Sequence, residues 1–165
     1  MTAQPATWQL RVATLDDLDA IMALETATFE NDAWSAASMR SEIANPSARY
    51  LVAEALEPPR AVVGYGGVLA PRRSEQADIQ TIAVAPSARR AGLGRTLMNA
   101  LITEATVRGA REVFLEVRAD NPGAQQLYDS LGFEALAIRA GYYQPDNVDA
   151  IVMRLTVPTP TAGAE

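Results

Sequence analysis

The sequence predicts an α/β protein with a mixed sheet and helices on both of its faces. Strand-like segments and stretches of helical spacing follow the order β-α-α-β-β-β-α-β-α-β-β. The helical stretch 93–108 lies directly between the strand-like segments 77–84 and 111–118. A strand, helix, strand passage takes a right-handed crossover, so those two strands should be parallel.

Alternation of apolar and polar residues predicts the first strand, and capping residues predict the first two helices. Residues 8–13 alternate weakly between apolar and polar, as a strand does. Thr14 and Asp17 have the spacing of a capping box, which begins the helix 14–29. A second short helix, 36–45, opens after a Trp-Ser pair and is closed by a proline.

The middle of the chain predicts a meander followed by a helix. Residues 48–55 and 61–70 read as strands joined across "LEPPR", and 77–84 is the third strand. The helix 93–108 carries one apolar stripe of leucine and alanine, and Gly109 ends it.

The C-terminal part predicts one more helix and the remaining strands. Residues 111–118 form an apolar strand, and 121–130 form a short helix with Asn121 as its N-cap. The last two strands are expected at 133–139 and 149–155.

The length of 165 residues suits a single domain. We expect residues 1–155 to form it and residues 156–165, rich in proline and threonine, to be a frayed tail. The first residues lack the basic and apolar regions of a signal peptide, and no apolar run reaches the ~18 residues of a membrane span. The expectation is a soluble, cytoplasmic domain that does not bind membranes, with its oligomeric state left open.

The composition narrows the chemistry. The chain has no cysteine and no histidine, which excludes thiolate chemistry, a Ser-His-Asp triad and the commonest metal ligands, so no metal is expected. Acid–base work falls to Asp, Glu, Tyr or an amine of the substrate. The net charge of −6 argues against nucleic acid as the main partner and suits a basic one, although a solvated acidic surface also explains it.

The stretch "VAPSARRAGLGRTLM", residues 84–98, predicts an anion-binding turn. The first N–H groups of the following helix have no partner within the helix, and the helix dipole adds positive charge there. Gly92 and Gly94 allow close approach to the backbone. Guanidinium groups at positions 89, 90 and 95 match the oxygens of a pyrophosphate.

Two well-known phosphate-binding motifs that use such turns do not fit this sequence. A dinucleotide-binding fingerprint needs glycine where Leu97 stands, and a P-loop needs Gly-Lys-Ser/Thr, which is missing. The remaining alternatives are another phosphate ligand and an ordinary turn whose arginines are solvated.

The motif "RRAGLG" resembles the CoA pyrophosphate loop of the GCN5-related N-acetyltransferases. Downstream, "LEVRADNPGAQQLYDSLGF" and "IRAGYY" are similar to the RimI-type ribosomal-protein alanine N-acetyltransferases. The resemblance covers about 120 residues, from the second helix to the last strand. It implies a mostly antiparallel sheet whose central parallel pair is splayed to admit CoA. The loop "PRRSEQADI" departs from the pattern, and the role of residues 71–77 is left open.

Glu116 is the candidate general base. Strand alternation places it opposite Val113, Leu115 and Val117, and an apolar strand invites partial burial that would raise the pKa of the carboxyl group. An ion pair with a nearby arginine or a solvated edge position is the alternative. The resemblance implies that this glutamate accepts the proton of the amine, directly or through water.

Tyr128 is the candidate general acid, since a phenol can protonate a leaving thiolate. A core tyrosine is the alternative, and the resemblance implies the catalytic role. Asn121 is expected to cap its helix, and the resemblance implies that it also contacts CoA.

The other site residues are expected from the resemblance. The main chain of Ile82, Ala83 and Val84 would pair with the pantetheine amides of acetyl-CoA. The pyrophosphate would lie on Arg89, Arg90, Ala91, Gly92, Leu93, Gly94 and Arg95. The acceptor groove would be lined by Trp34, Tyr142 and Tyr143, for which aromatic packing over a sheet edge is the alternative.

These observations together predict an acetyl-CoA-dependent N-acetyltransferase that works by direct attack in a ternary complex. The resemblance implies that its acceptor is a protein N-terminus, the N-terminal alanine of small-subunit ribosomal protein eighteen. Two rivals stay open: an acetyltransferase for lysine side chains or small-molecule amines, and a CoA-binding sensor without turnover.

Overall fold

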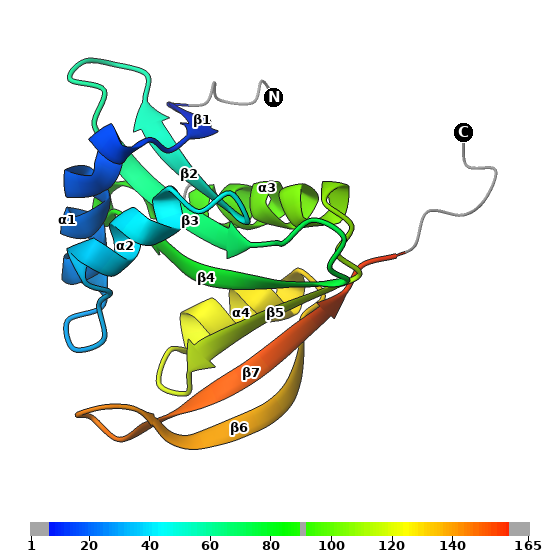
Figure 1. Cartoon of the computed structure of the whole chain (residues 1–165). Coiled ribbons are helices and arrows are strands. Elements are labelled where there is room, and N and C mark those ends of the chain that lie inside the picture. The colour runs from blue at the N-terminus through cyan, green and yellow to red at the C-terminus, as the bar shows by residue number, and fades with distance from the viewer. Residues whose placement is uncertain (1–6, 90–91, 159–165) are drawn as a thin grey trace, which may run out of the picture.

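The computed structural model describes residues 7–89 and 92–158, and the predicted order of elements is confirmed (Figure 1). In chain order the elements are β1 (Trp8–Val12), the 3-10 turn η1 (Leu15–Asp17), α1 (Leu18–Thr28), α2 (Ala36–Ile43), β2 (Ala48–Ala55), β3 (Val62–Leu69), β4 (Gln76–Val84), the 3-10 turn η2 (Pro86–Ala88), α3 (Leu93–Val107), β5 (Glu112–Arg118), α4 (Pro122–Ser130), β6 (Glu134–Tyr143) and β7 (Val148–Thr156).

The strands form one sheet in the order β1-β2-β3-β4-β5-β7-β6. Among the strands of the described residues, only β4 and β5 are parallel, and every other neighbouring pair is antiparallel. The predicted mixed, mostly antiparallel sheet is therefore confirmed. Strand β6 is longer than expected and runs on to Tyr143.

The parallel pair separates soon after it forms. β4 and β5 are in register only from Gln76 to Asp78 and from Glu112 to Phe114. Beyond these residues the two strands diverge, as Figure 1 shows. Gln80 is an extra residue in the pairing of β4 with β3, and such a bulge bends the strand. We call the resulting gap the sheet opening.

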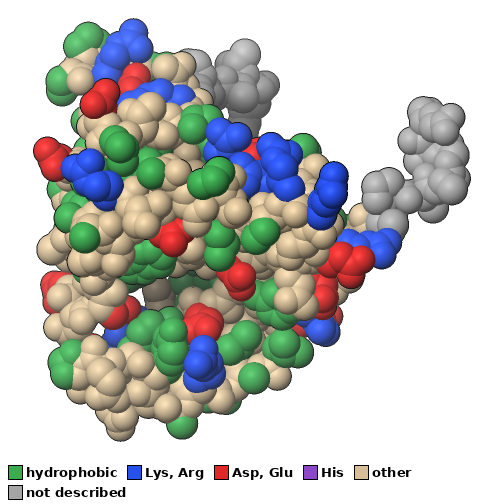
Figure 2. All heavy atoms as spheres, viewed as in Figure 1, with side chains coloured by type: hydrophobic (Ala, Val, Ile, Leu, Met, Phe, Trp, Pro, Cys, Tyr) green, Lys and Arg blue, Asp and Glu red, His purple; other side chains and the backbone are tan. Residues whose placement is uncertain are grey.

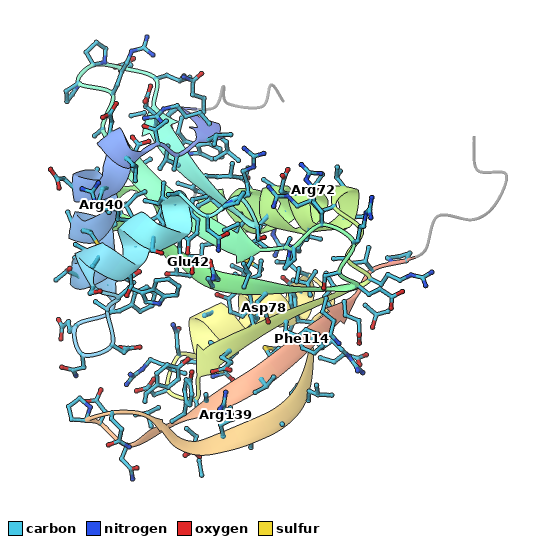
Figure 3. The ribbon with its side chains drawn as sticks, in the orientation of Figure 1. Arg40, Glu42, Arg72, Asp78, Phe114 and Arg139 are labelled. Carbon is cyan, nitrogen blue, oxygen red and sulfur yellow. The ribbon has the colours of Figure 1, made fainter. Side chains whose placement is uncertain are left out.

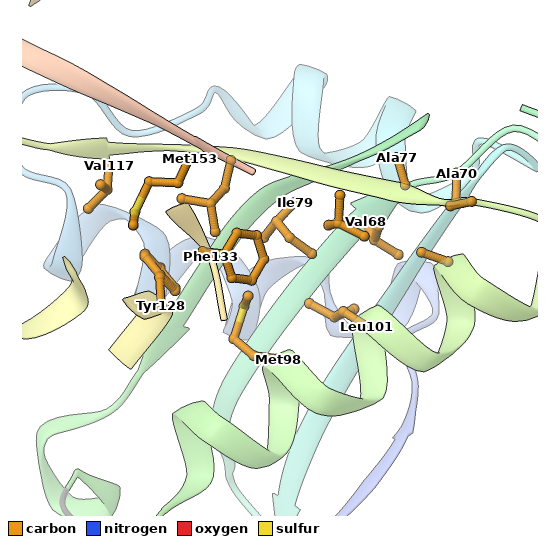
Figure 4. Close-up of a cluster of buried hydrophobic side chains, with 14 residues drawn as sticks. Val68, Ala70, Ala77, Ile79, Met98, Leu101, Val117, Tyr128, Phe133 and Met153 are labelled. Carbon is orange, nitrogen blue, oxygen red and sulfur yellow. The ribbon is translucent and has the colours of Figure 1, made fainter. Parts of the chain in front are cut away.

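Helices cover both faces of the sheet, as expected. Helices α1 and α2 pack on one face, against β2, β3 and β4, whereas α3 packs on the other. The larger core cluster lies on the α3 side, where Met98, Leu101, Tyr128 and Phe133 meet β4, β5 and β7 (Figure 4). Burial of these side chains fixes α4 against the outer half of the sheet.

The structure confirms the predicted capping box and shows that the last strand runs further than expected. Thr14 and Asp17 form the predicted capping box, with the Thr14 N–H donating to Asp17 Oδ2 at 2.8 Å. The frayed tail was expected to begin at residue 156. Instead, β7 includes Thr156, and the Val157 N–H donates to the Arg111 carbonyl at 2.8 Å. Pairing with the start of β5 holds these residues in place.

The loop before β4 lies at the closed end of the sheet opening. The Arg73 N–H donates to the Arg108 carbonyl at 3.3 Å, and the Arg111 N–H donates to the Glu75 carbonyl at 2.7 Å. The loop is thus tied to the C-terminal end of α3. In the part of the chain that the structure describes, no helix combines the length and apolarity needed to span a membrane.

Candidate active site

Beyond Asp78, one edge of β4 has no neighbouring strand among the described residues. Ile82, Ala83 and Val84 pair with β3 on one side only, since β5 has already diverged. Main-chain N–H and C=O groups on the other side can pair with an extended ligand that carries amides. These are the residues that the sequence led us to expect there.

The N-terminus of α3 lies just beyond the end of β4. Gly92 is the N-cap residue, with a left-handed φ of +81°, and a Cβ at this position would meet nothing within 4 Å. The turn therefore needs glycine for its conformation, and the space beside it is open to a ligand. Leu93, the first residue of α3, is buried, and Gly94 is half-buried.

Arginines flank this turn on both sides. Arg89 is exposed and donates from Nε to the Val84 carbonyl at 3.1 Å. Arg95 is exposed and donates from Nη2 to Ser130 Oγ at 2.7 Å, which links α3 to α4. Both guanidinium groups keep N–H donors that these bonds do not use. Arg90 and Ala91, also expected to bind the pyrophosphate, lie outside the described residues.

Helix α4 carries Asn121 and Tyr128. Asn121 is the N-cap, as predicted, and its Oδ1 accepts from the Ala124 N–H at 3.2 Å. Tyr128 is 8% exposed and packs on Phe133, with ring centroids 6.0 Å apart. Burial raises the pKa of the Tyr128 hydroxyl to about 12, so the phenol remains protonated at neutral pH.

Glu116 points away from the core side of β5, as strand alternation predicted. Its carboxylate accepts a hydrogen bond from Arg139 Nη1 at 2.8 Å, and its side chain remains 31% exposed. The sequence left open partial burial, an ion pair and a solvated edge position, and the structure has the ion pair. Figure 3 shows Arg139 and Phe114 on this face of the sheet, together with Asp78 of β4.

The charge of Glu116 raises the pKa of three neighbouring groups. Burial first, and then that charge, raises the pKa of Tyr143 to about 12. The pKa of Asp78 is raised, first by burial and then by the negative charge of Glu116. The pKa of Tyr142 is raised by burial, then by the Glu116 charge and by a hydrogen bond with that carboxylate. Glu116 thus lies near one other carboxylate, a guanidinium and two phenols at the edge of the sheet opening.

Glu116 and Tyr128 lie on opposite faces of β5. Tyr128 belongs to the core cluster and lies near Val117 and Met153 in Figure 4. Glu116 lies on the face that carries Arg139. The space-filling view in Figure 2 shows the molecule hollowed in the region of the sheet opening.

The expected acceptor residues lie on two sides of the opening. Trp34 lines an open depression of about 360 Å³ together with Ser38, Ser41 and Glu42 of α2. Tyr142 and Tyr143, at the end of β6, meet edge to face with ring centroids 5.1 Å apart. Each of these tyrosines also packs on a guanidinium, Tyr142 on Arg139 at 4.5 Å and Tyr143 on Arg118 at 5.1 Å.

Glu25 is a residue of this region that the sequence did not single out. It is 1% exposed, and its carboxylate accepts from the Tyr65 hydroxyl, from Thr81 Oγ1 at 2.9 Å and from the Trp34 N–H at 2.9 Å. A carboxylate on the apolar stripe of the first helix was the available clue, because buried carboxylates need such partners.

Arg118, Arg139 and Asp78 were also missed as site residues. Arg118 shares the strand face of Glu116, which was a usable clue. Arg139 belongs to the motif "IRAGYY", which was a usable clue, whereas Asp78 carried no local pattern. Both approach Glu116 only through sheet pairing.

The comparisons with known proteins agree with this architecture. The acetyltransferase (GNAT) family model matches residues 18–133. The N-alpha-acetyltransferase RimI of Mycobacterium tuberculosis is 34% identical over 157 residues, which cover 93% of this chain and 96% of that protein. A crystal structure of the ribosomal-protein-S18-alanine N-acetyltransferase from Escherichia coli matches with a TM-score of 0.77 and 29% identity, covering 93% of this chain and 96% of that one.

A further relative is longer than this chain. The uncharacterized protein ML0378 of Mycobacterium leprae is 37% identical over 141 residues, 84% of this chain, but the chain spans only 38% of that protein's length. The family match covers most of the sequence and includes the turn around Gly92, β5 and α4. The chain belongs to the GNAT family of acetyltransferases, in its RimI-type subgroup, and is an N-acetyltransferase.

Proposed function

We propose that this protein acetylates the N-terminal α-amino group of a protein, with acetyl-CoA as the donor substrate and the N-terminal alanine of ribosomal protein S18 as the acceptor, in the cytoplasm. The observation that carries the proposal is the sheet opening, with the N-terminus of α3 and the open space at Gly92 at one end and Glu116 at its edge. The likeness to RimI-type proteins over 93% of the chain supports the choice of acceptor.

The residues at the opening suit acetyl-CoA. The unpaired edge at Ile82, Ala83 and Val84 has the donors and acceptors that pantetheine amides require. The open space at Gly92, together with Arg89 and Arg95, suits a pyrophosphate. Arg90 and Asn121 would add to these contacts. Acetyl-CoA supplies the thioester that makes acetyl transfer favourable.

The proposed chemistry assigns one proton transfer to each face of β5. Glu116 accepts the proton of the acceptor ammonium, directly or through a water molecule. The free amine attacks the thioester carbonyl, so that a C–N bond forms and the C–S bond breaks. Tyr128 is protonated at neutral pH, and it donates its proton to the departing thiolate. The acceptor nitrogen loses its second proton as the amide forms, and this proton restores the phenol.

The ion pair with Arg139 fits this role for Glu116. The Arg139 guanidinium holds one carboxylate oxygen of Glu116, and Tyr142 also forms a hydrogen bond with this carboxylate, so its orientation is restrained. Trp34 on one side and the tyrosine pair 142–143 on the other would receive the first residues of the acceptor.

The test is acetyl transfer to a panel of peptides that begin with Ala, Ser or Met, beside an N-terminally blocked peptide with an internal lysine. We expect turnover of the Ala peptide and a fall in kcat of about 100-fold or more in Glu116→Gln. Glu112→Gln is the matched control, because Glu112 lies on the same strand face, is ion-paired to Arg154 and has the same 31% side-chain exposure.

Each outcome decides between the candidates. Turnover on lysine or on a small amine, with none on any free N-terminus, would overturn the proposed acceptor. Binding of acetyl-CoA without turnover on any amine would identify a sensor. Equal rates in Glu116→Gln and Glu112→Gln would remove Glu116 as the base.

A further inference from the structure

Arg118, the last residue of β5, binds three carboxylates from different segments of the chain. Its Nε and Nη2 donate to Asp120 at 2.9 and 3.0 Å, and Nη2 also donates to Asp146 at 3.0 Å. Its Nη1 lies 3.5 Å from Asp32 Oδ1. The Arg118 side chain is only 19% exposed, so these partners take up most of its surface.

The partners of Arg118 belong to the segments around the sheet opening. Asp32 lies in the loop between α1 and α2, and Asp146 lies in the turn between β6 and β7. A second contact joins the same two segments, since Asn31 Nδ2 donates to both carboxylate oxygens of Asp146 at 2.9 and 3.1 Å. Arg118 therefore bridges segments that are more than a hundred residues apart in the sequence.

The contact between the α1–α2 loop and the β6–β7 turn depends on the positive charge of Arg118. Three carboxylates gather at one guanidinium, so its removal would leave like charges facing each other. Asp32 and Asp146 would then repel, and the loop and the turn that carry them would separate. The Asn31 contact alone would have to hold them.

The bridged segments also carry the expected acceptor residues. Trp34 follows Asp32 by two positions in the same loop. Tyr143 precedes the turn of Asp146, and its ring packs on the Arg118 guanidinium at 5.1 Å. One guanidinium thus sets both the spacing of the two segments and the orientation of one aromatic ring.

We propose that Arg118 is a positioning residue that holds the α1–α2 loop against the β6–β7 turn and thereby shapes the entrance for the acceptor peptide. The inference rests on the proposed function only in taking these two segments as the acceptor side. Arg118 acts through Asp32, Asp146 and Tyr143 and has no part in proton transfer.

The kinetic test compares Arg118→Gln and Arg118→Lys with wild type in acetyl transfer to the Ala peptide. We expect Arg118→Gln to raise the acceptor KM about tenfold, with kcat within about threefold and the KM for acetyl-CoA within about twofold. Arg118→Lys should recover only part of this loss, because an ammonium cannot engage three carboxylates as a planar fork does.

Arg11→Gln is the matched control. Arg11 binds Asp17 and Glu54, each at 2.8 Å, and lies on β1 at the far edge of the sheet. It reports what the loss of a multiply paired arginine does to folding alone. We expect it to leave both KM values unchanged.

A sharper test is whether the effect of one substitution on the acceptor KM changes sign between two backgrounds. Asp32→Asn in the wild-type background removes an attraction and should raise the acceptor KM. In the Arg118→Gln background the same change removes a repulsion and should lower the acceptor KM. A purely structural role for Arg118 predicts the same sign in both backgrounds, and that result would overturn the inference.

Hydrogen exchange tests the bridge without any turnover. Amides in residues 29–35 and 144–147 should exchange faster in Arg118→Gln than in wild type, whereas Arg11→Gln should leave them unchanged. Unchanged exchange in both segments would overturn the inference even if the enzyme is active. Failure of wild type to acetylate any peptide would sink the proposed function and leave this measurement valid. If Arg118→Gln does not fold, Arg118→Lys and Asp146→Asn carry the same comparison.

Discussion

The Glu116 carboxylate on β5 and the Arg139 guanidinium on β6 form an ion pair of 2.8 Å across the intervening strand β7. The Arg139 guanidinium also lies 4.5 Å from the ring centroid of Tyr142. One edge of the sheet opening is therefore a chain of contacts from a carboxylate through a guanidinium to a phenol. The arrangement orients the proposed base from the side away from the core.

Arg139→Gln should separate orientation from stability. Both side chains are partly exposed, so we expect a loss of at most ~2 kcal/mol from the ion pair and the ring contact together. We expect kcat to fall about three- to tenfold, because the carboxylate loses its fixed orientation. Urea unfolding and peptide kinetics measure the two effects. Arg154→Gln removes the equivalent partner of Glu112 and should leave kcat unchanged; a similar fall in both variants would contradict the role of Arg139.

Tyr128→Phe should lower kcat about 100-fold at neutral pH if Tyr128 is the acid. The ring and its packing on Phe133 are retained, so the urea midpoint should change little. In wild type, the pKa of about 12 keeps the hydroxyl protonated, and kcat should therefore show no fall between pH 8 and about 10 from this group. A kcat for Tyr128→Phe within twofold of wild type would leave Tyr128 as a core residue only.

Arg95→Gln should weaken acetyl-CoA binding without affecting the fold. Arg95 is exposed and its described partner is Ser130 Oγ, so little stability depends on it. We expect the Kd for acetyl-CoA to rise about three- to tenfold, with a weaker dependence on salt, because one charge-assisted contact to phosphate is lost. Calorimetric titration measures both. Arg72→Gln, in the exposed loop before β4, is the control, and an equal change there would contradict the assignment.

Gly67→Ala should be strongly destabilising. A Cβ on Gly67 would lie 2.2 Å from Cζ of the buried Tyr50 ring, whose hydroxyl donates to Gln80 at 2.8 Å. The ring cannot move without losing that bond beside the β4 bulge, so we expect a loss of about 3 kcal/mol in the free energy of unfolding. Gly123→Ala is the control, since its added methyl group has ample space and unfolding should change by under ~1 kcal/mol. Equal urea midpoints for the two variants would refute the packing argument.

Protonation of Asp17 should lower the free energy of unfolding at acid pH. The hydrogen bonds from the Arg11 guanidinium hold the pKa of Asp17 below its usual value of 3.8. The unfolded state then binds the proton more readily, so stability from this group is complete above about pH 4 and is lost as pH falls through the folded pKa. Asp17→Asn should flatten this part of the pH profile, measured by urea unfolding between about pH 6 and pH 3. A profile as steep as that of wild type would show that other carboxylates carry it.

Local chemistry was enough to predict the elements. Apolar period, the Thr14–Asp17 box and the Asn121 cap act between residues a few positions apart, and each is present in the structure. The turn around Gly92 was also predictable, because a strand followed directly by a helix leaves free N–H groups at a known place.

The sequence by itself determined the order of strands and helices, the parallel pair and the face of β5 on which Glu116 lies. Only the tertiary structure decided which groups face Glu116 and Arg118. Arg139 reaches Glu116 because β7 inserts between β5 and β6, and Asp146 reaches Asn31 from 115 residues away. Such contacts depend on strand order and register across the whole sheet, whereas periodicity and caps are properties of short segments.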